Sequence, residues 1–115
     1  FVNKLEIIII ENQTQNKLAT KKMKELLINK NIKIVNKKYE IRSVQNSITN
    51  WYIIIDSLQQ IIDISKTVWD IYESCGQKEG ITFIFNFFKN KIVSITSPIS
   101  QDDILKKINS YFNLK

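Results

Sequence analysis

The chain has no histidine, a single cysteine and only two glycines in its 115 residues. Without histidine it lacks the commonest general base, the usual partner of a serine or cysteine nucleophile, and a frequent zinc ligand. Gly76 and Gly80 are too few to build a glycine-rich phosphate loop. Cys75 alone makes neither an internal disulfide nor a metal cluster, which favours a reducing, cytoplasmic location. We therefore predict a protein that is not an enzyme and has no catalytic residues, cofactor or metal site.

Arginine is almost absent as well, with Arg42 as its only occurrence, so the net charge of +6 comes from lysine. Lysine is a hydrated point charge, whereas bidentate recognition of guanine or phosphate usually falls to arginine. The excess of positive charge therefore indicates solubility more than nucleic-acid binding.

The length fits a single domain over residues 1–115. The chain begins at Phe1 rather than Met, which leaves open whether residues precede it.

Alternating apolar runs and amphipathic stretches predict an α+β fold, an α/β sandwich with a small mixed sheet and helices mainly on one face. A strand, a helix and a second strand form a βαβ unit, whose two strands are expected to be parallel. Residues 39–44 either prolong the second strand or pair back as a separate one, and the sequence leaves both open. A β-hairpin and a C-terminal helix capped by Ser100 complete the chain. The expected strands are 4–11, 32–35, 81–88 and 91–96, and the expected helices are 15–29, about 50–75 and 101–112.

The most apolar segment, residues 51–72, reads WYIIIDSLQQIIDISKTVWDIY. Asp56, Asp63 and Asp70 interrupt it, and carboxylates at the centre of a bilayer cost about 2.5–3.5 kcal/mol each, so we do not expect a membrane span. Because these aspartates recur every seven residues, they predict one polar stripe on a long amphipathic central helix that ends at Gly76. Such a helix is longer than a small sheet can cover, so part of its apolar face is expected to bind a protein partner or a second copy. The alternative, which the sequence leaves open, is a kinked helix with both tryptophans folded into the core of the protein itself. The predicted interface residues are Trp51, Tyr52, Ile55, Trp69 and Tyr72.

A basic stretch between Lys17 and Arg42 supports a second hypothesis, an RNA-binding subunit of a larger ribonucleoprotein assembly. If its helix and strand face the same way, they form a cationic patch able to meet phosphates. Tyr39 is the only aromatic residue in this stretch, so a base-stacking platform is missing. The phenylalanines of the hairpin, Phe83, Phe85, Phe87 and Phe88, are better explained as core. The candidate patch consists of Lys17, Lys21, Lys24, Lys33, Lys37, Lys38 and Arg42.

The order of elements resembles the effector-associated constant components of bacterial conflict systems. The similar segments are LEIIIIE, LATKKMKELL, NIKIV, WYIIIDSLQQII, ITFIFNFFKNKIVSIT and QDDILKKINSYF. The resemblance covers nearly the whole chain, but it is one of pattern and order without a diagnostic motif. The chain also departs from it in lacking a Gly/Ala-rich central helix. The resemblance implies a non-catalytic accessory or adaptor component that works beside effector domains, and it offers no catalytic residues.

Overall fold

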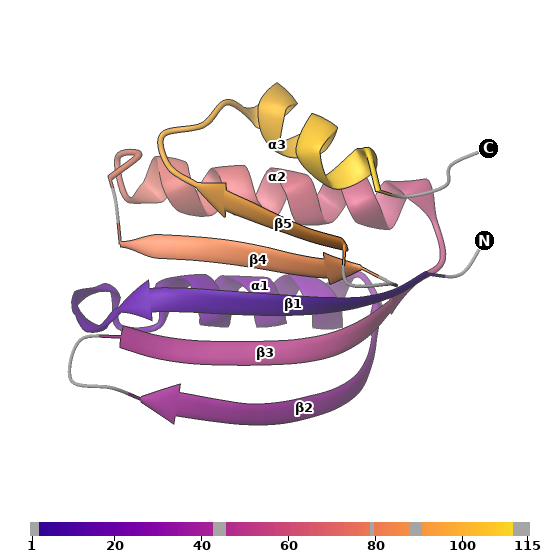
Figure 1. The fold of residues 1–115 in the computed structure, drawn as a ribbon, viewed down its shortest axis with the longest axis horizontal. Coiled ribbons are helices and arrows are strands. Elements are labelled where there is room, and N and C mark those ends of the chain that lie inside the picture. The colour runs from indigo at the N-terminus through magenta and orange to yellow at the C-terminus, as the bar shows by residue number, and fades with distance from the viewer. Residues whose placement is uncertain (1–2, 43–45, 79, 88–90, 112–115) are drawn as a thin grey trace.

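The computed structural model describes residues 3–42, 46–78, 80–87 and 91–111, without the side chains of residues 13 and 36–42. Five strands form one sheet in the order β2-β3-β1-β4-β5, and three helices lie on one of its faces. In Figure 1 the sheet lies toward the viewer, with α1 and α2 behind it and α3 at the top. The predicted α+β class, with helices on one face, is confirmed.

Every neighbouring pair of strands in the sheet is antiparallel, so the prediction of a mixed sheet is wrong. The first two strands, β1 and β2, do run in the same direction, but β3 lies between them and pairs with both. This is the split βαβ, or ferredoxin-like, connectivity, with β5 and α3 added beyond β4. The strands are β1 (Asn3–Asn12), β2 (Lys33–Arg42), β3 (Asn46–Ile55), β4 (Ile81–Phe87) and β5 (Lys91–Thr96).

Residues 39–42 prolong β2 rather than forming a strand of their own, while 43 and 44 lie outside the described residues. The register of β2 against β3 shifts between Ile34 and Asn36 and again between Lys37 and Glu40. Such irregularities increase the local twist of an edge strand and make it a poorer template for further pairing.

The core lies between the sheet and the helices. Side chains alternate along each strand, so one set from β1, β3 and β4 meets the apolar faces of the helices. On β4 this set is Phe83, Phe85 and Phe87, which places these phenylalanines in the core as predicted, while Phe88 lies outside the described residues. The helices are α1 (Leu18–Asn29), α2 (Leu58–Ser74) and α3 (Gln101–Asn109), with a short 3-10 turn η1 at Gln13–Gln15.

The central helix is shorter than predicted, because residues 50–55, expected to form its first turns, belong to strand β3. Asp56 therefore precedes the helix, and only Asp63 and Asp70 share it, so the three-aspartate stripe is also wrong. Ser57 caps the helix by accepting a hydrogen bond from the Gln60 amide at 3.3 Å. The Gln60 side chain in turn accepts from the Asp56 amide at 2.8 Å. This reciprocal capping ends the strand and starts the helix.

Other local predictions are confirmed. Helix α2 ends at Ser74 with Cys75 as its C-cap, and Gly76 follows with a φ of +66°, a left-handed conformation that favours glycine. Ser100 caps α3 by accepting from the Asp103 amide at 3.2 Å. Strands β4 and β5 form the predicted antiparallel hairpin. Within the described residues, no helix is long and apolar enough to cross a membrane.

Candidate interaction surface

Three of the five residues predicted to meet a partner belong to the core. Trp51 is 2% exposed, and Ile55 and Tyr72 are fully buried. The Tyr72 hydroxyl lies 2.8 Å from the Ile95 carbonyl oxygen and 3.0 Å from the Ile81 carbonyl oxygen. Its one proton is shared between these two acceptors. Burial raises the pKa of Tyr72 well above its ordinary value, although a backbone hydrogen bond at Phe83 opposes part of that effect. These three residues hold the subunit together, and their assignment to an interface is wrong.

Trp69 is half-buried and lines an open groove between α2 and the start of α3. The groove has a volume of about 650 Å³ and includes the carboxylates of Glu73, Asp102 and Asp103. All three carboxylates belong to exposed residues and face solvent. The groove is therefore a solvated acidic surface, in which Trp69 is the one predicted interface residue.

The predicted basic patch is divided between opposite sides of the molecule. Lys21 and Lys24 are exposed on α1, which lies behind the sheet. Lys33 pairs across the sheet with Ile54, on the opposite face. Lys17 precedes α1 with a left-handed φ of 57°. The side chains of Lys37, Lys38 and Arg42 lie outside the described part of the structure. Lys33 and the α1 lysines do not form the single patch that the phosphate-binding hypothesis required.

The face of the sheet turned away from the helices carries a row of partly exposed apolar side chains, and we call it the open face. Tyr52, the remaining predicted interface residue, lies on it, as part of strand β3 rather than of a helix. Around Tyr52 the open face carries isoleucines on four strands, and on β4 and β5 they alternate with Thr82, Ser94 and Thr96. The isoleucines of this face whose side chains are described are Ile8, Ile10, Ile48, Ile54, Ile84 and Ile92.

The isoleucines of the open face differ in how far their neighbours cover them. Those on β1, β3 and β4 are half-buried, because adjacent side chains on neighbouring strands shield one another. Ile92 on the edge strand β5 is 59% exposed. No described helix packs on this side (Figure 1). The sheet thus has an apolar face that the helices cover and a second face, of isoleucines and polar residues, that no described helix covers.

A polar group interrupts the isoleucines at the centre of the open face. The Glu6 carboxylate on β1 accepts a hydrogen bond from the Asn50 side-chain amide at 2.6 Å and one from the Asn86 amide at 3.2 Å. Because each amide directs its nitrogen to the carboxylate, its oxygen points away. The Oδ1 atoms of Asn50 and Asn86 are buried and have no hydrogen-bond partner, and Asn50 is 7% exposed overall. A buried acceptor without a donor costs about 1–3 kcal/mol.

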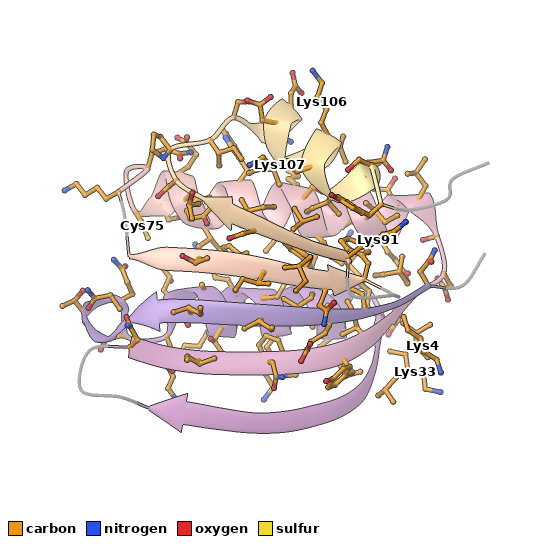
Figure 2. All side chains as sticks on the ribbon, in the orientation of Figure 1. Lys4, Lys33, Cys75, Lys91, Lys106 and Lys107 are labelled. Atoms are coloured by element: carbon orange, nitrogen blue, oxygen red, sulfur yellow. The ribbon has the colours of Figure 1, made fainter. Side chains whose placement is uncertain are left out.

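Two lysines lie beside this group on the same face. Lys4 and Lys33 are both opposite Ile54 in the sheet register, on either side of β3. Figure 2 shows them at one corner of the sheet, and both are exposed. Lys4 is two residues from Glu6 on the same strand, a separation of about 7 Å at 3.4 Å per residue. Acceptors and cations therefore lie next to each other on the open face.

The first strand carries a sequence signal for this surface. Its run of four isoleucines, Ile7 to Ile10, predicts a strand covered on both faces. In the subunit Ile7 and Ile9 are fully buried against the helices, whereas Ile8 and Ile10 lie on the open face. The run is typical of a central position in a sheet with helices on both sides, and the described residues supply helices on one side only.

No family model matches the chain, and neither the curated proteins nor the solved structures contain a match to it. The resemblance to effector-associated constant components therefore stays a prediction from the order of the elements. What the chain does has to be argued from its surfaces.

Proposed function

We propose that this protein is a non-catalytic interaction module, and that its open face is the surface that binds a protein partner. The observation that carries the proposal is the aliphatic layer on the side without helices, which includes Ile8, Ile84 and Ile92. Large apolar patches on soluble proteins usually mark sites of association. An adaptor role beside effector domains is compatible with this surface and remains an expectation from the resemblance alone.

A matched pair of substitutions tests the open face. Ile92 on β5 and Ile28 on α1 are the same residue type, and each is 59% exposed. We expect Ile92→Lys to abolish the association of the protein with its partner, because a lysine ammonium would have to be desolvated in an apolar contact. Ile28→Lys makes the same change on the helical side and should leave association intact. Equal behaviour of the two variants in co-purification from the cells of origin would contradict the proposal.

The RNA-binding alternative is favoured by one observation, the position of Tyr52. RNA-binding sheets of this connectivity stack bases on aromatic side chains of their open face. Here the open face offers Tyr52 with Lys4 and Lys33 nearby, while Phe83 and Phe85 lie in the core on the other side. Among the described side chains of the open face, Tyr52 is the one aromatic residue, which makes RNA binding the weaker candidate. It predicts binding of single-stranded RNA that falls steeply between about 50 and 200 mM salt and that Tyr52→Ala abolishes.

A further inference from the structure

We propose that the free edge of β5, together with the groove between β5 and α3, binds an extended acidic segment of a partner protein, which adds a strand to the sheet. This site is the edge of the sheet and not its open face, so the inference goes beyond the proposed function. Three features of the molecule support it: the regularity of the edge, the direction of its backbone groups, and the charge around the groove.

The two edge strands of the sheet differ in regularity. The register of β2 against β3 shifts twice, which makes that edge a poor template for a further strand. Strand β5 pairs with β4 without a shift, from Lys91 opposite Phe87 to Thr96 opposite Thr82. A regular edge is what strand addition requires, because the added strand has to follow the hydrogen-bond spacing of its neighbour. Of the two edges, β5 is therefore the one suited to an added strand.

The backbone of β5 presents unpaired groups at its outer edge. The carbonyl oxygens of Ile95 on β5 and Ile81 on β4 both accept from the Tyr72 hydroxyl, so the Ile95 carbonyl points toward β4. Successive residues of a strand direct their N–H and C=O groups to opposite edges, which turns those of Ser94 outward. Among the described residues, no hydrogen bond reaches this outer edge. Its donors and acceptors are therefore free to pair with an extended segment.

A groove lies between the end of β5 and α3. It has a volume of about 370 Å³ and is lined by Thr96, Pro98, Ile99, Asp103, Lys106 and Lys107. Helix α3 buries Ile104 and Ile108 and packs mainly against α2, with less contact to β5. The helix therefore stands beside the edge of β5 and forms one wall of the groove (Figure 1).

Lysines dominate the charge around this groove. Lys106 and Lys107 are exposed on α3, and Lys91 is exposed at the start of β5 (Figure 2). Lys91 is opposite the core residue Phe87, so its side chain lies on the helical side of the sheet, as α3 does. Against these lysines, the lining of the groove contains one carboxylate, that of Asp103. The excess of positive charge favours a segment that carries carboxylates.

The two sides of β5 specify the side chains that suit an added strand. These side chains alternate between the faces of the sheet, as those of β5 do. On the helical side they lie near Lys91 and Lys107, where carboxylates are favoured. On the other side they lie next to Ile92, which is 59% exposed and favours an aliphatic neighbour. The matching segment therefore alternates acidic and aliphatic residues, whereas β5 of a second copy, KIVSIT, contains no carboxylate.

Two model peptides test the charge of the occupant. One is an acetylated and amidated peptide of about eight residues, long enough to span β5, in which glutamate alternates with valine. In the other, lysine replaces glutamate. We expect the glutamate peptide to bind about tenfold more tightly, because several exposed ion pairs differ between the two complexes. Binding is measured by NMR from the backbone amide shifts of isotope-labelled protein, which should change along β5 and α3.

Matched substitutions test the backbone contact and the charge separately. Ser94→Pro removes an outward N–H group and suits an edge strand at such a position, whereas Ser94→Ala keeps that N–H. We expect the glutamate peptide to lose its binding to Ser94→Pro and to bind Ser94→Ala as it binds the wild type. Lys107→Glu should reverse the preference between the two peptides, and Lys21→Glu, on the exposed side of α1, should keep the wild-type preference. The dispersion of the amide signals establishes that each variant is folded.

Binding that is lost in Ser94→Pro and reversed in Lys107→Glu supports the edge and its groove as the site. If Ser94→Pro fails to fold, the reversal in Lys107→Glu together with amide shifts along β5 supports the same conclusion. Equal binding of the two peptides to the wild type, or binding of neither, overturns the acidic segment as occupant. Equal binding of the glutamate peptide to Ser94→Pro and Ser94→Ala overturns the edge as the site. A dimeric wild type that becomes monomeric in Ser94→Pro and binds neither peptide assigns the edge to a second copy instead.

Discussion

At the scale of single residues, a buried carboxylate organises the start of the first helix. Glu11 is fully buried at the end of β1. It accepts hydrogen bonds from the backbone amides of Ala19 at 2.7 Å and Thr20 at 3.1 Å, and from the Thr20 hydroxyl. The residue before the helix, Lys17, provides no side-chain cap. Glu11 thus takes the role of the missing cap from a neighbouring strand, where its charge also meets the positive end of the helix dipole.

Glu11→Gln should therefore destabilise the fold. The amide retains one accepting oxygen where the carboxylate has two, and hydrogen bonds to a charged group are worth about 1.5–3 kcal/mol. We expect the free energy of unfolding to fall by about 2 kcal/mol, measured by urea denaturation. Glu25→Gln is the matched control, because Glu25 is exposed on the same helix. A similar loss in both variants would show that the Glu11 contacts contribute nothing specific.

The Tyr72 hydroxyl is a second buried polar group, and it joins α2 to β4 and β5. Tyr72→Phe leaves the Ile81 and Ile95 carbonyl oxygens without this donor, which should cost about 1–3 kcal/mol at pH 7. The pKa of Tyr72 is raised in the folded protein, so between pH 7 and about pH 9 neither state releases its proton. Above about pH 10 the unfolded chain releases the proton first, and the stability due to Tyr72 is lost as pH rises. The difference between wild type and variant in denaturation midpoint should therefore shrink above pH 10, and a constant difference would contradict this.

At the scale of elements, the boundary between β3 and α2 depends on two adjacent capping interactions. Ser57→Ala removes the oxygen that accepts from the Gln60 amide. Loss of an N-cap costs about 0.5–2 kcal/mol, so the thermal midpoint should fall by several degrees. Ser57→Thr keeps an accepting hydroxyl and should recover most of the loss. If Ala and Thr behave alike at this position, the cap is not what starts the helix.

The same boundary shows how far the sequence alone could be interpreted. The hairpin, the Gly76 stop and the Ser100 cap follow from local chemistry, and the sequence predicts each of them. The S-x-x-Q motif at Ser57 is equally local, but the apolar run around it matches a buried strand as well as a helix. Tertiary context decides in favour of the strand, because β3 completes the sheet between β1 and β2. Most of the interface residues predicted on a helix therefore lie in the core. Because the sequence pattern assigns residues 50–55 to a helix, it does not predict the open face of the sheet.

At the scale of the whole molecule, antiparallel pairing and helices on one side leave one face of the sheet, rich in isoleucine, without a covering helix among the described residues. In many antiparallel sheets, apolar residues point to the core and polar residues point to solvent, so the solvent face does not favour association. Ile8, Ile48 and Ile84 break this alternation at the middle of the sheet. The fold therefore places its association surface on the strands, while the groove at Trp69 and the lysines of α1 lie on the helical side.

If the edge of β5 binds an acidic segment, the stability of the folded chain depends on the concentration of that segment. A ligand that binds only the folded state stabilises it through mass action, by about 1.4 kcal/mol when its free concentration is about ten times its dissociation constant. For a domain of this size that corresponds to a rise of about 5 °C in the thermal midpoint. We expect this rise with the glutamate–valine peptide for the wild type and for Ser94→Ala in scanning calorimetry, and a constant midpoint for Ser94→Pro. A constant midpoint in all three proteins would mean that the folded chain does not hold the peptide at this edge.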